Sequence, residues 1–242
     1  GIHSRSSSVT IETTRATASG GSGSNAGIFI EQAQEPLSAQ LNNVIAEADC
    51  DNCSETVGVE TVGVYVSNAR LIANNVTATA EKSGLAIGIR VESSSDVNIS
   101  NSTAYGIEAT ENYGISVRNG SSATVNDITA TGASTNLQAS YGIEVNGMSA
   151  ISTLNAFNTK AVGEAGNAGV AAIVDGNGTT ASFTNSVLDG ESMNLGKSIE
   201  LVSDGAAKVV NTRFEPPNVV SSDDLTCLNT YYLSLAEADA DC

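Results

Sequence analysis

Three charged residues lie at neighbouring outward positions in successive copies of a short repeated pattern, and they are the residues best placed for acid–base chemistry. They are Glu92, Arg118 and Glu144. Elimination from an acidic polysaccharide needs a basic side chain beside acidic calcium ligands, and these three residues form the nearest such set. Opposite charges on adjacent strands also form structural cross-strand pairs, and we favour that interpretation over catalysis.

Hydrolysis of a glycosidic bond needs two acidic side chains at a defined separation, one protonated and one ionised. The sequence holds one Asp-Asp pair, Asp223-Asp224, which lies near the C-terminal end, and one histidine, His3, which lies at the opposite end. The expected catalytic pair is therefore not assembled, and we lean towards a protein that is not an enzyme.

Three ring-bearing residues occupy equivalent outward positions in the first three copies of the pattern, namely His3, Phe29 and Tyr65. A row of rings outside a polar protein indicates either a platform on which sugars stack or a contact surface for another protein. A purely structural ladder of stacked rings is the alternative that we favour. We take these three residues as the binding candidates.

Four acidic residues fall within a nine-residue segment: Glu47, Asp49, Asp51 and Glu55. Calcium binds several carboxylate and carbonyl oxygens, so these residues are the candidate calcium ligands. Their spacing matches neither an EF-hand loop nor a glycine-rich calcium repeat, and a solvated loop is the favoured interpretation. We expect no cofactor, with calcium as the sole candidate.

The elements that would position these residues come from an internal repeat. The pattern Gly-Ile-x-Val, with variants, starts at residues 1, 27, 63, 88, 114, 142, 171 and 198, so most copies are about 26 residues apart. Each copy offers three short strands of alternating apolar and polar residues between Gly, Asn and Ser turns, without helical periodicity. About eight such units predict one parallel β-helix, in which each coil buries its inner face by pairing with the next.

The repeat length, the Gly-Ile-x-Val strands and a recurrent asparagine make the chain similar to right-handed parallel β-helix proteins of the pectate-lyase-like superfamily, over residues 1 to about 214. The resemblance is closer to adhesins and phage tailspikes than to the catalytic members. It implies a structural ladder of stacked amide side chains at one turn, formed here by Asn101, Asp127, Asn185 and Asn211. We expect Asn101 to be buried in this ladder. Asn43, Asn74 and Asn155 are less securely aligned with this ladder.

Residues 1–214 are predicted to form the β-helix, with an insert loop at 46–57, and residues 215–242 a C-terminal cap over its open end. The four cysteines form two local pairs, Cys50 with Cys53 in the insert and Cys227 with Cys242 in the tail. Five or six coils separate the pairs, which is far beyond disulfide reach. We therefore predict the disulfides Cys50–Cys53 and Cys227–Cys242.

Composition restricts the partners. The 242 residues contain 27 acids and 10 Lys or Arg, a net charge of −17. That charge disfavours nucleic acid and anionic membranes, and no apolar segment is long enough for membrane insertion. Cysteines in an acidic chain favour an extracellular or cell-surface location.

We expect a non-enzymatic module for adhesion or carbohydrate recognition, with a glycan or host-surface ligand. A homo-oligomer, such as a trimer, is an option. A polysaccharide lyase or hydrolase and a structural stalk are the alternatives.

Overall fold

A computed structural model provides the structure of the chain. It describes residues 1–6, 8–20, 23–31, 38–50, 59–135, 139–166, 168–192, 196–215, 219–220 and 224–232. Within these ranges the backbone forms strands, turns and bends and contains no helix. Accordingly, none of the described segments is a helix with the length and apolarity that crossing a bilayer would require.

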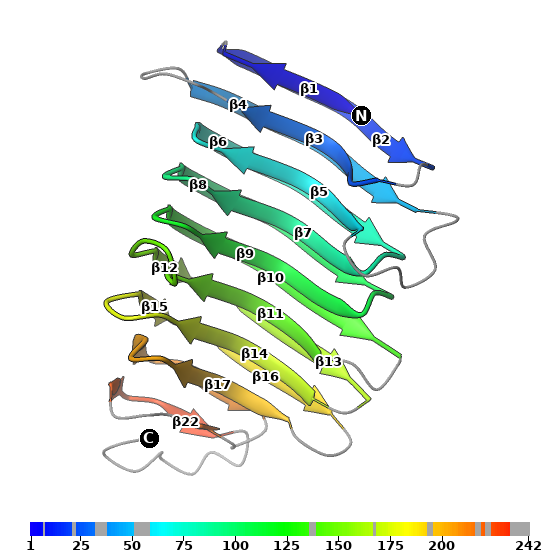
Figure 1. The fold of residues 1–242 in the computed structure, drawn as a ribbon. Helices are drawn as coiled ribbons and strands as arrows, with labels where there is room; N and C mark the ends of the chain where they lie inside the picture. Colours follow the sequence, from blue (N-terminus) through cyan, green and yellow to red (C-terminus); the bar gives the residue numbers. More distant parts are fainter. Residues whose placement is uncertain are drawn as a thin grey trace.

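The strands form a parallel β-solenoid of about seven turns, in which two sheets face each other across a narrow interior (Figure 1). The first sheet has nine strands, in this order: β1 (Ile2–Arg5), β3 (Asn25–Glu31), β5 (Glu60–Ser67), β7 (Leu85–Glu92), β9 (Glu111–Arg118), β11 (Ala139–Asn146), β14 (Ala168–Asp175), β17 (Lys197–Val202) and β20 (Val219–Val220). The eight predicted repeat starts correspond to β1 through β17, and seven complete turns lie between them.

The second sheet carries the rest of each turn. Its main path runs β2 (Val9–Ser19), β4 (Ser38–Asp49), β6 (Arg70–Glu81), β8 (Asp96–Ile107), β10 (Ser122–Ser134), β12 (Thr153–Phe157), β15 (Thr180–Thr184), β18 (Ala206–Val210) and β21 (Leu225–Leu228). From β12 onward the strand is divided, and the second half is β13 (Lys160–Ala165), β16 (Val187–Ser192), β19 (Arg213–Glu215) or β22 (Tyr231–Tyr232). β10 pairs with both β12 and β13. In the earlier turns, one long strand therefore contains both the second and the third short strand that the repeat predicted.

Small and branched apolar side chains fill the space between the sheets. The pairing stacks each inward residue on its equivalent in the next turn, as with Ile89, Ile115 and Ile143, which are all fully buried. Phe183 and Phe214 are the largest fully buried side chains and lie towards the C-terminal end. The low aromatic content therefore suits a thin interior with room for one layer of Ile, Val, Leu and Ala from each sheet.

The recurrent asparagine marks a corner in the second sheet. Nine residues at equivalent places in successive turns have positive φ and are exposed: Thr13, Asn43, Asn75, Asn101, Asp127, Asn158, Asn185, Asn211 and Asn229. Asn is tolerated there because its short polar side chain suits left-handed backbone. Some members do form amide ladders, as between Asn211 and Asn185 (3.2 Å). The expectation of a buried ladder is nevertheless wrong, and Asn75 and Asn158 replace Asn74 and Asn155.

This corner gives a first testable prediction. We expect Asn101→Val to lower the free energy of unfolding by about 1–2 kcal/mol, the cost of left-handed backbone for a branched residue. Asn101→Gly should be close to neutral, although it removes the hydrogen bond from Asn101 to the Asn74 Oδ1 (2.9 Å). Urea unfolding of both variants measures this. Equal losses in the two variants would show that the amide contact, rather than the backbone conformation, matters at this corner.

Two predicted boundaries need revision. The predicted insert loop spans 46–57, but residues 46–49 belong to strand β4 and Cys50 is buried directly after it. Residues 51–58 lie outside the described residues. At the other end, β20, β21 and β22 pair in parallel with β17, β18 and β19, so the described residues beyond 214 continue the solenoid. The cap itself is not shown, since residues 233–242 are outside the described ranges.

Candidate functional site

The three ring-bearing candidates lie side by side on the outer face of the first sheet. His3 pairs with Phe29 and Phe29 with Tyr65 in the strand register, as the repeat predicted. Their ring centroids are 4.6 Å apart at both steps, with interplanar angles of 15° and 12°. Both faces of the Phe29 ring are therefore covered by neighbouring rings, and His3 and Tyr65 each have one ring face covered by Phe29. This arrangement is the structural ladder, and it leaves mainly ring edges for a sugar.

At the Tyr65 end of this ladder, the tyrosine contacts charged residues of the neighbouring strand. The Tyr65 hydroxyl donates a hydrogen bond to Glu92, and the Arg90 guanidinium lies 5.2 Å from the Tyr65 ring centroid. Arg90 also contacts Glu92 (2.8 Å) and Glu60 (2.6 Å). Burial, followed by the hydrogen bond to Glu92, raises the pKa of Tyr65 well above its ordinary value. The phenol stays protonated as a donor, and Glu92 is fully engaged.

A second cluster joins two of the catalytic candidates. The side chains of Ser116 and Arg118 each donate to the Glu144 Oε2 at 2.6 Å. Arg118 also lies 5.3 Å from the ring centroid of Tyr113, which is stacked on Tyr141 at 5.0 Å. The side chains of Arg118 and Glu144 are only 20% and 9% exposed. The structure thus brings Arg118 and Glu144 together, while Glu92 pairs with Arg90 instead.

The Arg118–Glu144 pair does not suit base catalysis. Burial alone would lower the pKa of Arg118, but the charge and hydrogen bond of Glu144 outweigh burial and raise that pKa. A guanidinium held in its charged form cannot accept a proton. Glu144 in turn accepts from a hydroxyl and a guanidinium, as expected of a paired structural carboxylate. The geometry therefore favours the cross-strand pair that we preferred from the sequence.

The calcium candidates are only partly described. Glu47 and Asp49 lie on strand β4 rather than in a loop, whereas Asp51 and Glu55 are outside the described residues. Arg15 binds both carboxylate oxygens of Glu47, at 2.8 and 2.9 Å. Within the described ranges, no group of three His, Cys, Asp or Glu side chains is arranged to hold a metal ion.

The cysteine pairs also involve undescribed residues. Cys50 directly follows β4 and Cys227 lies on β21, whereas Cys53 and Cys242 are outside the described ranges. Neither described cysteine is a free thiol. Seven strand spacings separate β4 from β21, roughly 34 Å along the solenoid axis, which excludes a bond between Cys50 and Cys227. The local pairs Cys50–Cys53 and Cys227–Cys242 stay predictions.

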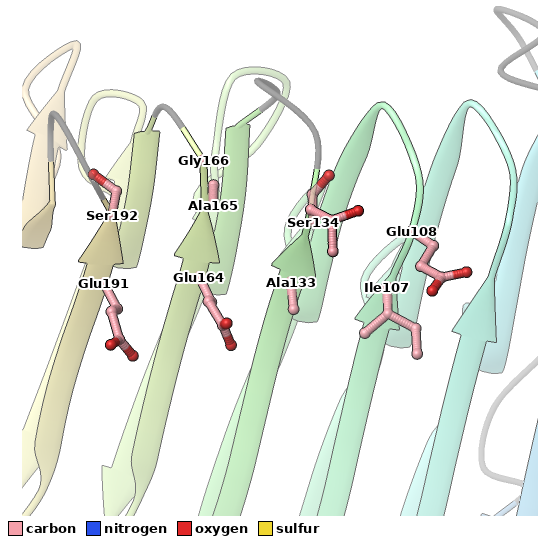
Figure 2. A pocket seen from close by; sticks show the side chains of 10 residues that line it. Ile107, Glu108, Ala133, Ser134, Glu164, Ala165, Gly166, Glu191 and Ser192 are labelled. Carbon is pink, nitrogen blue, oxygen red and sulfur yellow. The ribbon is translucent and has the colours of Figure 1, made fainter.

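A groove that the sequence analysis missed runs across the ends of β8, β10, β13 and β16 (Figure 2). Its volume is about 640 Å³, within the range of small-molecule and oligosaccharide sites. Ile107, Ala133, Ala165 and Gly166 give it a mainly apolar lining. The remaining lining residues are polar, namely Glu108, Ser134, Thr135, Glu164, Glu191 and Ser192.

The register of the second sheet explains the groove. Gly106, Gly132, Gly163 and Gly190 are paired in neighbouring turns, so the residues that follow them form one outward row. That row is Ile107, Ala133, Glu164 and Glu191. Figure 2 shows the two glutamate side chains on the same side of neighbouring strands, with the short Ala133 side chain beside them. Aligning these glycines in the sequence would have revealed the row, whereas the Gly-Ile-x-Val pattern lies in the other sheet.

Comparison with known protein families, curated proteins and solved structures finds no match for this chain. The structure therefore shows a parallel β-solenoid, and no match supports the pectate-lyase-like superfamily.

Proposed function

We propose that this chain is a non-catalytic recognition module of an extracellular or cell-surface protein, and that it binds a segment of glycan in the groove across β8, β10, β13 and β16. The groove carries the proposal. It combines an apolar lining, on which a sugar ring packs, with hydroxyl and carboxylate groups that hydrogen-bond to sugar hydroxyls. It also runs across successive turns, which suits an extended chain.

Two further observations concern the candidate residues outside the groove. Glu92 and Glu144, the carboxylates among the catalytic candidates, are each paired with an arginine, so neither is available as the free acid or base that glycoside cleavage requires. The aromatic ladder presents edges rather than faces, so the groove is the better sugar site. A parallel β-solenoid suits the display role that we expected from the sequence resemblance to adhesins and tailspikes, and a structural stalk is the alternative that the experiment below separates.

The proposal predicts that filling the groove abolishes glycan binding. Ala133 faces outward and is small, so Ala133→Tyr should occupy the groove without entering the interior. On a glycan array, read with and without calcium, we expect the native chain to bind a defined set of oligosaccharides and Ala133→Tyr to lose them. Thr124→Tyr, near the other end of strand β10, is the matched control.

A native chain that binds no glycan on the array would contradict the proposal and favour the stalk. Equal binding by Ala133→Tyr and Thr124→Tyr would place the glycan elsewhere. Release of shortened or unsaturated sugars from a bound oligosaccharide would contradict the non-catalytic assignment.

A further inference from the structure

Three carboxylates at the rim of the groove form no ion pair within the part of the chain that the structure describes. Nine of the ten lysines and arginines form ion pairs with acids elsewhere. Among the described residues, none of these pairs involves Glu108, Glu164 or Glu191. Most of the few positive side chains therefore pair with other acids, and the negative charges of these three exposed glutamates are not neutralised by an ion pair among the described residues.

Two of these glutamates face each other directly. Glu164 pairs with Glu191 in the parallel register of β13 and β16, so their backbones are about 4.8 Å apart. Like charges at directly opposed positions destabilise a sheet. Because a bound cation would relieve this repulsion, the two carboxylates favour a positively charged ligand over a neutral or anionic one.

The arrangement of the carboxylates indicates an extended cation rather than a metal ion. Glu108 follows β8 and lies two strands away from Glu164 on β13, about 10 Å along the solenoid axis. The three acids are therefore spread along the groove. Within the described residues they form no cluster that could hold a metal ion. Several positive groups on one chain would match this spacing better.

The other lining residues indicate what must lie between the positive groups. Ile107, Ala133 and Ala165 offer a mainly apolar surface, and the exposed Thr135 adds a hydroxyl group beside it. A sugar ring has an apolar face and hydroxyl groups around its edge, so it uses both kinds of contact. A simple aliphatic polyamine would use the apolar surface but would make no use of the exposed Thr135 hydroxyl.

We propose that the groove selects glycans that carry free amino groups, with Glu108, Glu164 and Glu191 binding the ammonium groups while Ile107 and Ala133 contact the sugar rings. This inference rests on the proposed glycan-binding function and narrows it to one ligand class. Binding is then electrostatically driven at exposed carboxylates, so it weakens as ionic strength rises.

Titration calorimetry with two matched oligosaccharides tests the inference. The probes are the hexasaccharides of glucosamine and of N-acetylglucosamine, which share a backbone and differ in whether the nitrogen is charged. We expect the native chain to bind the glucosamine hexasaccharide about tenfold more tightly or better, the amount that a lost charge-assisted hydrogen bond accounts for. Raising the salt concentration should reduce this preference.

Charge-neutral variants locate the effect. The triple variant Glu108→Gln/Glu164→Gln/Glu191→Gln keeps the shape of the groove and should abolish the preference for the charged sugar. Glu12→Gln, an exposed glutamate on β2, is the matched control and should leave the preference unchanged. Thermal unfolding of both variants checks that each remains folded.

Several results would overturn the inference. If both hexasaccharides bind with equal affinity, in the native chain and in the triple variant, the selection for amino groups is wrong while the glycan-binding function stands. If spermine or hexalysine binds as tightly as the glucosamine hexasaccharide, the groove is a general cation surface. If neither hexasaccharide binds, the inference fails, and the glycan array alone decides the proposed function.

Discussion

Replacing Arg118 with methionine is expected to destabilise the protein by about 3 kcal/mol, because the substitution leaves the Glu144 carboxylate buried without its cation. Glu144 is 9% exposed and receives a hydrogen bond from Arg118 at 2.6 Å. Ser116 would remain as a donor at 2.6 Å, so we place the loss at the lower end of the usual range for breaking a buried pair. Urea-induced unfolding of the variant measures this loss.

An exposed ion pair provides the matched control. Arg5 contacts Glu31 at 3.2 Å on the same outer face, but the Arg5 side chain is 68% exposed. Exposed pairs contribute at most about 1 kcal/mol, so Arg5→Met should cost far less than Arg118→Met. Similar losses in the two variants would show that the Arg118–Glu144 pair is not the buried structural element that its geometry indicates.

A double variant separates the charge from the packing. In Arg118→Met/Glu144→Gln no unpaired charge remains, and exchanging a buried pair for uncharged groups of similar size is often close to neutral. We expect the double variant to recover most of the stability that Arg118→Met loses. Recovery would show that the penalty comes from the isolated carboxylate, whereas continued loss would assign it to the packing of Arg118 on Tyr113.

The repeat length and strand alternation were sufficient to predict the solenoid and the outward rows of its first sheet. Residues such as His3, Phe29 and Tyr65 lie in register because each copy of the pattern begins one turn after the last. The environment of the asparagine column could not be predicted in the same way. The resemblance to β-helix proteins implied a buried ladder, whereas the left-handed backbone at Asn101 interrupts the strand alternation and leaves the Asn101 side chain exposed to solvent.

The groove was beyond the sequence analysis for a related reason. It depends on which residues of four different turns become neighbours, and strand lengths differ between those turns, with β10 undivided and β13 and β16 separate. A shift of one residue in the assumed register would move Glu164 to the other side of the sheet. Only the paired positions of Gly163 and Gly190 establish that Glu164 and Glu191 face outward together.

The glycine of the Gly-Ile-x-Val pattern has a packing role that strand alternation alone does not predict. Gly88 and Gly114 lie within strands β7 and β9, at a seam where the backbones of the two sheets are in close contact. A Cβ atom on Gly114 would lie 2.4 Å from the backbone nitrogen of Thr131 and 2.6 Å from the carbonyl oxygen of Gly142. Both atoms belong to the backbone of strands that are hydrogen-bonded within their own sheets, β10 for Thr131 and β11 for Gly142. Neither atom can therefore move aside as a flexible side chain would.

Gly114→Ala should therefore destabilise the protein by about 3 kcal/mol, at the upper end of the usual cost of overpacking. The cost should fall on the whole solenoid turn, since separating the sheets at Gly114 also disturbs the stacking of Ile115 on Ile89 and Ile143. Gly23→Ala is the control, because a Cβ at Gly23 has no atom within 4 Å, and it should be close to neutral. Guanidinium unfolding of the two variants decides the point: a loss below about 1 kcal/mol for Gly114→Ala would mean that the seam can widen, and that the repeated glycine is kept for another reason.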